Sequence, residues 1–263
     1  MHGPPHPVKS LTPPLLVAAL VVVAGACPAA VQQTPVSAST VAPALPAPEV
    51  QALAPFNARY VVFRGGKPLG EATLNLVSVE RARWRIDLRI EATHGLYSLA
   101  NLDLQQSTVF DETAAGFRPL SQSTVRKAIF SRKQATGTYD WSRNVAQWTG
   151  DVKKNRRAAV PLQPGDMNAL LINLAMLRDA APGATLHYRF VDYGRARDEE
   201  FRVSAAREPQ VVEDLAYAAL RVDRVRGGGN TTTFWVVESV PTPIRIVQQD
   251  DDGDLELQLV EYQ

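Results

Sequence analysis

The chain has 263 residues, with 28 basic against 27 acidic residues and a single cysteine. This length suits one large domain or two small ones, with enough residues for a hydrophobic core. The near-neutral charge provides no basic face of the kind that nucleic-acid binding requires, so nucleic acid is not an expected partner. One cysteine excludes an internal disulfide and a cysteine-ligated metal cluster, and we expect no metal and no cofactor.

Residues 1–26 are predicted to be a signal peptide. Lys9 precedes an unbroken apolar run over residues 15–23, and Ala24-Gly25-Ala26 follows it. A basic start, a short apolar segment and a small-residue cleavage site form a secretory leader in that order. The run is about half of the roughly 20 apolar residues that span a bilayer. We therefore expect export to the periplasm.

Cys27 follows the small residues directly, where a bacterial lipoprotein has its acylated cysteine. The match to a lipobox is partial, because Ala24 stands where leucine is usual and Pro28 comes next. Two interpretations stay open. Acylation would tether the chain to a membrane surface, whereas plain cleavage would leave an ordinary thiol.

Residues 27–55 are rich in proline and alanine, with prolines at 28, 35, 43, 46, 48 and 55. No helical or alternating period persists through these breaks. We expect a disordered linker that spans up to roughly 80 Å when extended.

Period-two alternation dominates residues 56–263, which we expect to form one β-rich domain. In residues 83–91 every even position is apolar and every odd position is charged, which indicates a strand with one buried and one solvated face. Residues 186–190 and 255–259 repeat the pattern. Turn signals occur at residues 65–68, 227–230 and 252–253. The pattern predicts about ten to twelve strands in an antiparallel meander, forming a curved sheet, an open barrel or a sandwich.

Residues 166–179 do not follow the period-two alternation, because their apolar residues recur at helical spacing. The apolar positions on one side are Met167, Leu170, Leu171, Leu174 and Leu177. Asp166 is the expected N-cap, and Pro182-Gly183 should end the element. Because Ile172 and Met176 make the opposite side apolar too, we expect the helix to be buried in the concave face of the curved sheet.

The sequence shows no catalytic signature. A Gly-x-Ser-x-Gly elbow is absent from the chain. His94 and His187 fall on separate predicted elements. The two carboxylates of a glycosidase need not be close in sequence, and on that ground alone Asp103, Asp111 and Glu112 are candidates. We expect no catalytic residues and no enzyme, with a hydrolase acting on envelope polymers as an alternative.

Residues 153–157 form a dense basic segment, to which Arg126-Lys127 and Arg132-Lys133 are candidates to add. A solvated loop and a site for an anionic lipid or polymer surface are both open interpretations. The acidic run at residues 250–254 lacks the spacing of a calcium loop, so we interpret it as a hairpin turn.

An apolar ligand is the binding hypothesis that the leucines suggest. Candidate ligand-binding residues are Leu96, Tyr97 and Leu99 in an apolar loop, and Leu170, Leu174 and Leu177 on the helix. Two alternatives remain: the loop closes one end of the core, and the helix fills the concavity completely.

Several segments appear in a familiar order. They are Tyr60-Val61-Val62-Phe63, Phe117-Arg118-Pro119-Leu120, Tyr139-Asp140-Trp141, the helix at 166–177, Phe234-Trp235-Val236 and Pro243-Ile244-Arg245-Ile246. Together they resemble the envelope proteins grouped as domain of unknown function 3108. The resemblance implies export and a β-rich fold, and it supplies no catalytic residues. Pro241 is an additional proline before the last of these segments.

We therefore expect a periplasmic cell-envelope binding or accessory protein. Lipid or another envelope protein is the expected partner, with membrane contact only through an acylated Cys27. An outer-membrane β-barrel protein is the alternative from a different class.

Overall fold

The computed structural model describes residues 52–95, 103–212, 214–228, 231–249, 251 and 253–263. The predicted signal peptide, Cys27 and most of the predicted linker lie outside these residues, as do Leu96, Tyr97 and Leu99. Within the described part of the chain, no helix has the length and hydropathy needed to cross a membrane.

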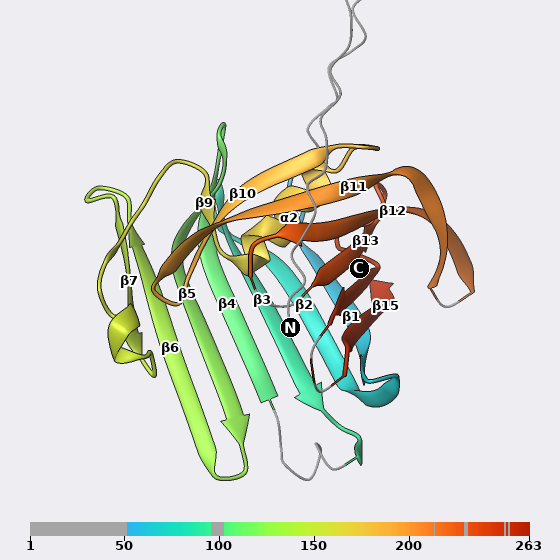
Figure 1. The fold of residues 1–263 in the computed structure, drawn as a ribbon, viewed down its shortest axis with the longest axis horizontal. Coiled ribbons are helices and arrows are strands. Elements are labelled where there is room, and N and C mark those ends of the chain that lie inside the picture. The colour runs from blue at the N-terminus through green and yellow to red at the C-terminus, as the bar shows by residue number, and fades with distance from the viewer. Residues whose placement is uncertain (1–51, 96–102, 213, 229–230, 250, 252) are drawn as a thin grey trace, which may run out of the picture. The chain divides into compact units, whose positions relative to one another are not determined.

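The described residues form one fifteen-stranded sheet with two helical segments (Figure 1). The strands are β1 (Phe56–Arg64), β2 (Lys67–Glu80), β3 (Arg83–Ala92), β4 (Asp103–Thr113), β5 (Gly116–Ala128), β6 (Ser131–Asp140), β7 (Val145–Gly150), β8 (Val160–Pro161), β9 (Asp166–Met167), β10 (Thr185–Asp192), β11 (Arg195–Val212), β12 (Leu215–Arg226), β13 (Thr232–Val236), β14 (Arg245–Gln248) and β15 (Leu255–Tyr262). The helical segments are the 3-10 helix η1 (Lys154–Arg156) and the α-helix α2 (Ala169–Asp179). The expected count of strands was too low, in part because β8 and β9 have two residues each and show no alternation.

Except for β8 and β9, strands that follow one another in the chain are neighbours in this sheet, and β15 returns to pair with β1. All pairs are antiparallel except β9 with β10. The sheet curves without closing, because β8 and β9 are its two edges. The prediction of a mainly β, antiparallel, curved sheet is confirmed, and the sheet is open. Since one sheet contains every described strand, the fold is not a sandwich of two sheets.

Alternating burial explains why these segments form strands. The buried side chains of β1 are Phe56, Ala58, Tyr60 and Val62. In β3, which the 83–91 pattern predicted, Trp84 and Ile86 are buried. The first turn is shorter than predicted: β2 begins at Lys67, so Gly65 and Gly66, both with positive φ, form the turn between β1 and β2.

Helix α2 packs against β5 and β10 on the concave face of the sheet (Figure 1). Its buried residues are Leu170, Leu171, Ile172, Leu174, Ala175 and Met176. These residues cover more than one side of the helix, as predicted from its apolar character all round. The helix ends at Asp179, shortly before the predicted Pro182-Gly183 stop.

The N-cap of α2 is Asn168 and not the predicted Asp166. The Asn168 side chain accepts a hydrogen bond from the backbone N–H of Leu171 at 3.3 Å, which satisfies a donor of the first turn. Asp166 lies in β9, where its buried carboxylate accepts the Gln163 N–H and pairs with Arg189. The prediction failed because the pairing of β9 with β10 is a long-range contact that local spacing does not reveal.

A buried hydrogen-bond network ties the start of α2 to both sides of the open sheet. The Asn168 side-chain N–H₂ donates to Thr108 Oγ1 at 2.9 Å and to Gln122 Oε1 at 3.1 Å. The Tyr139 hydroxyl also donates to Gln122 Oε1, and Gln122 Nε2 donates to Asp192 Oδ1. The network therefore joins β4, β5 and β6 to the end of β10 across a region where backbone pairing is missing.

We expect Asp192→Asn to stabilise the protein at neutral pH. Burial raises the pKa of Asp192 to about 6, although the Gln122 hydrogen bond acts in the opposite direction. The protonated carboxyl is therefore favoured in the folded state, and stability is lost as the pH rises from about 4 through about 6. Asparagine stays neutral, so the free energy of unfolding should increase by about 1–3 kcal/mol at pH 7 and should not change near pH 4.

Urea unfolding followed by tryptophan fluorescence across this pH range measures the effect. Asp198→Asn, at an exposed position of β11, is the matched control. The raised pKa of Asp192 would be contradicted if the free energies of unfolding of Asp192→Asn and the unchanged chain differed by the same amount at every pH.

Candidate functional site

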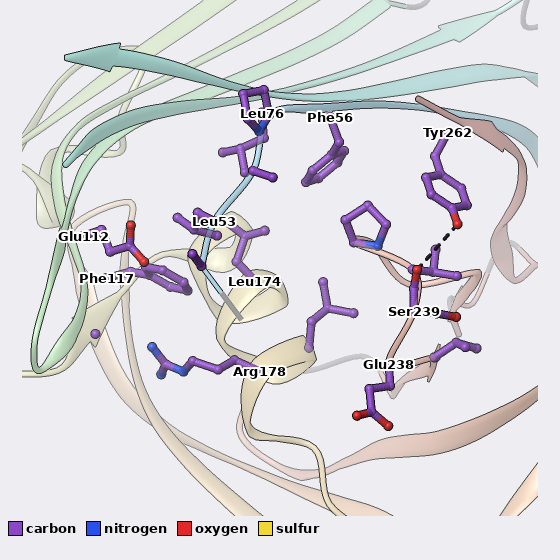
Figure 2. A pocket seen from close by; sticks show the side chains of 18 of the residues that line it. Leu53, Phe56, Leu76, Glu112, Phe117, Leu174, Arg178, Glu238, Ser239 and Tyr262 are labelled. Carbon is purple, nitrogen blue, oxygen red and sulfur yellow. Dashed lines mark hydrogen bonds between the residues drawn. The ribbon is translucent and has the colours of Figure 1, made fainter. Parts of the chain in front are cut away.

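A cavity of about 760 Å³ opens at the C-terminal end of α2 (Figure 2). Six separate parts of the chain form its walls: the segment leading into β1, the second half of β2, the β4–β5 hairpin, the last turns of α2, the connection after β13 and the end of β15. Its apolar wall residues include Leu53, Phe56, Leu76, Phe117, Leu174, Leu177 and Val240. Its polar residues include Glu112, Arg178, Glu238, Ser239 and Tyr262.

Pairing of the first and last strands places two aromatic side chains at this cavity. Asn57 and Gln263 exchange backbone hydrogen bonds of 3.0 and 2.9 Å. Phe56 and Tyr262 are each next to one of these paired residues, and both line the cavity (Figure 2). The Tyr262 hydroxyl donates to the Ser239 carbonyl at 3.5 Å.

The β4–β5 hairpin forms the wall on the other side of α2. The Thr113 hydroxyl donates to the Gly116 carbonyl at 2.8 Å, which holds the turn. Phe117, the next residue, packs edge-on against Phe110 with ring centroids 5.4 Å apart. The Arg178 guanidinium lies over the Phe117 ring at 5.0 Å, so the last turn of α2 closes onto this hairpin.

Arg178 is neutralised by its neighbour. Its guanidinium forms two hydrogen bonds with the Asp179 carboxylate, at 2.7 and 3.3 Å, and these bonds raise the pKa of Arg178. The Tyr188 hydroxyl donates to the same carboxylate at 3.0 Å. The described lining of the cavity itself has two carboxylates, Glu112 and Glu238, against the one cation of Arg178.

A buried tyrosine holds the connection between β13 and β14 in place. The Tyr60 hydroxyl bonds with Thr242 Oγ1 and donates to the Pro243 carbonyl at 2.9 Å. Burial raises the pKa of Tyr60 well above its ordinary value, so the hydroxyl keeps its proton for these bonds. Val240 and Pro241 of this connection thereby line the cavity.

The structure places two of the predicted ligand-binding residues together. Leu174 (Figure 2) and Leu177 both line the cavity. Leu170 does not: it borders a crevice of about 10 Å³ beside Thr108, too small for a ligand. Leu96, Tyr97 and Leu99 lie outside the described residues, and they remain a prediction.

Sequence reasoning missed most of the cavity wall. Arg178 and Tyr262 were not singled out, and Phe117 was named only as part of a family segment and not as a binding residue. Only Arg178 could have been predicted from local sequence, because it directly follows Leu177 in the predicted helix. The others reach the cavity through long-range strand pairing.

The titratable candidates do not gather at one place. His94 bonds with Thr93 at 2.9 Å after the end of β3, and His187 lies on β10 with its side chain 70% exposed. Asp103 and Asp111 lie at opposite ends of β4. Within the described ranges, no group of three or more histidine, cysteine, aspartate or glutamate residues could hold a metal ion.

Arginines hold Asp111 as a structural carboxylate. Although burial acts to raise it, hydrogen bonds and charge from Arg83 and Arg118 lower the pKa of Asp111 below its ordinary value. The nearest contacts are 2.9 Å to Arg83 and 3.1 Å to Arg118. An ionised carboxylate paired in this way is not prepared to give or take a proton at neutral pH.

Comparison with known proteins gives a family match and a structural alignment. No curated protein matches the sequence. A crystal structure of a beta-barrel-like protein of domain of unknown function DUF1849 from Brucella abortus aligns with a TM-score of 0.49 and 11% identity, over 79% of this chain and 96% of that chain. The family model described as "Protein of unknown function (DUF3108)" matches residues 56–260, in agreement with the resemblance noted in the sequence. The chain therefore belongs to the DUF3108 family.

Proposed function

We propose that this protein is a periplasmic cell-envelope binding protein whose cavity at the end of α2 takes an apolar or amphiphilic ligand. The cavity itself is the observation that supports binding. The order of basic, apolar and small residues in 1–26 supports export. Acylation of Cys27 would tether the domain to a membrane surface through the linker at residues 27–55.

The size and lining of the cavity suit a small lipid-like molecule. A volume of about 760 Å³ falls within the range of ordinary ligand pockets. Most of the lining residues are apolar, and the polar side chains among them include Glu112, Arg178 and Glu238. Burial of an alkyl chain against such walls is favourable at roughly 25 cal/mol per Å² of apolar surface.

The charges favour a ligand whose head group is uncharged. Arg178 is paired with Asp179 at 2.7 Å and so offers no free cation to a carboxylate or phosphate. Glu112 and Glu238 in the lining would repel an anionic head group. A monoacylglycerol therefore fits this site better than a fatty acid anion does.

The two alternative functions find less support in the geometry. An outer-membrane barrel needs an apolar outer surface, whereas the outward positions of β3 are Arg85, Asp87 and Arg89. A hydrolase needs two groups within reach of one substrate atom, and Asp103 and Asp111 lie at opposite ends of their strand.

We expect Leu177→Trp to weaken binding of an apolar probe by about tenfold, because the larger side chain overfills the cavity. N-phenyl-1-naphthylamine, an uncharged fluorophore, is the probe, and its displacement by monoolein reports binding of the lipid. Titrations use the full-length protein purified from the envelope of an exporting bacterial host.

Leu215→Trp is the matched control for this substitution. Leu215 is a 63%-exposed leucine in the β11–β12 hairpin, away from the cavity lining. It should leave the affinity unchanged. Equal affinity of the Leu177→Trp and unchanged proteins, or no probe binding by the unchanged protein, would refute the cavity as the binding site.

We also expect the processed chain to begin at an acylated Cys27. An intact mass spectrum of the same preparation should show a chain starting at Cys27 with added acyl mass, and Cys27→Ser should abolish that addition. A chain of unmodified mass cut after Ala26 would refute the anchor and leave the cavity proposal in place.

A further inference from the structure

The tip of the β5–β6 hairpin presents apolar side chains to solvent. Phe130 is 99% exposed and Ile129 is 53% exposed. These residues join β5, which ends at Ala128, to β6, which begins at Ser131. The two neighbouring side chains together form an apolar surface at the hairpin tip, where it is accessible to a partner outside the domain.

Four cations flank this tip, and the register brings them into like-charged pairs. Arg126 is directly opposite Lys133, and Lys127 is directly opposite Arg132. Like charges in opposite positions destabilise a strand pair. Among the described residues, Lys127 has a carboxylate at ion-pair distance, Asp103 at 3.3 Å, and the charge of Arg126 acts on the Asp192 carboxylate. These contacts do not account for Arg132 and Lys133, so folding explains only part of the cluster.

The tip projects beyond the described parts of its neighbouring strands. The last pair between β4 and β5 is Asp103 with Lys127, and the last pair between β6 and β7 is Ala135 with Gly150. Residues 128–131 thus extend past the described pairing of β5 with β4 and of β6 with β7, at the lower edge of the sheet in Figure 1. Nothing in the described sheet covers Ile129 and Phe130.

We propose that this hairpin tip docks on an anionic phospholipid surface. Ile129 and Phe130 enter the headgroup region, where an apolar side chain leaves water. The flanking Arg126, Arg132 and Lys133 bind lipid phosphates. All charged residues in 126–133 are basic. These basic residues favour an anionic lipid surface over an apolar protein partner, because binding to an apolar protein would not require cations around the tip.

Docking here goes beyond the proposed ligand site and does not depend on it. Gly116, at the start of β5, lines the cavity, whereas the tip follows the other end of the same strand. Thirteen residues of strand separate the two by roughly 40 Å. The hairpin would therefore hold the domain to a membrane with the cavity at the far end of β5 from that surface.

The test is quenching of a tryptophan placed at the tip of the full-length protein. Phe130→Trp is titrated with vesicles of brominated phosphatidylcholine, with and without an equal part of phosphatidylglycerol. Quenching of the native tryptophans is measured with the unchanged protein and subtracted as background. We expect strong additional quenching only when phosphatidylglycerol is present. Because this probe reports insertion of the tip itself, an acyl anchor at Cys27 does not produce the signal.

Two comparisons complete the experiment. Leu215→Trp places a tryptophan on the β11–β12 hairpin, which is also exposed and apolar but has Asp214 in place of the cations. It should show no additional quenching with phosphatidylglycerol. Adding Arg126→Gln and Arg132→Gln to Phe130→Trp should lower the vesicle affinity of the tip roughly 30-fold.

Three outcomes would overturn the proposal. They are no additional quenching of Phe130→Trp, equal quenching with vesicles of phosphatidylcholine alone, and equal quenching of Leu215→Trp. Unchanged thermal unfolding of Phe130→Trp is expected because the side chain is almost fully exposed, so loss of folding does not confuse the result.

Discussion

The fold depends on how a curved sheet that does not close is filled on its inner face. Between β8 and β9 backbone pairing is missing, so side chains must hold the two sides together. Helix α2 does this, since it is apolar on more than one side and packs against both β5 and β10. Its N-cap, Asn168, belongs to the hydrogen-bond network that reaches β4, β5 and β10. Sheet and helix therefore stabilise each other.

The same arrangement explains why a cavity remains. Eleven helical residues extend roughly 16 Å, whereas the thirteen residues of β5 extend roughly 40 Å. The helix cannot cover the concave face from end to end. Leu170 lies in the tightly packed part, where only about 10 Å³ is left, and Leu177 lies where the space opens to about 760 Å³.

The sequence predicts those features that depend on local spacing. Alternation in residues 83–91 identified β3, and helical spacing identified α2 and the side chains with which it fills the sheet. The N-cap was missed because β9 pairs with β10 over a long range and takes Asp166 away from the helix. Most of the cavity wall was missed for the same reason, since strand pairing from distant segments brings Phe56 and Phe117 to Leu174. At the β5–β6 hairpin the cations were visible in the sequence, but only the register shows that they oppose one another around an exposed Phe130.

The rate at which a single thiol reacts within α2 tests the central claim most directly. The chain has one cysteine, so Cys27→Ser provides a background in which Leu177→Cys and Leu170→Cys can be compared with N-ethylmaleimide. If α2 fills the sheet and leaves a cavity at its C-terminal end, the thiol at 177 reacts quickly and the thiol at 170 reacts only when the protein unfolds. Equal protection at both positions would show that no cavity opens there. Equal and rapid reaction would show that the helix does not fill the sheet.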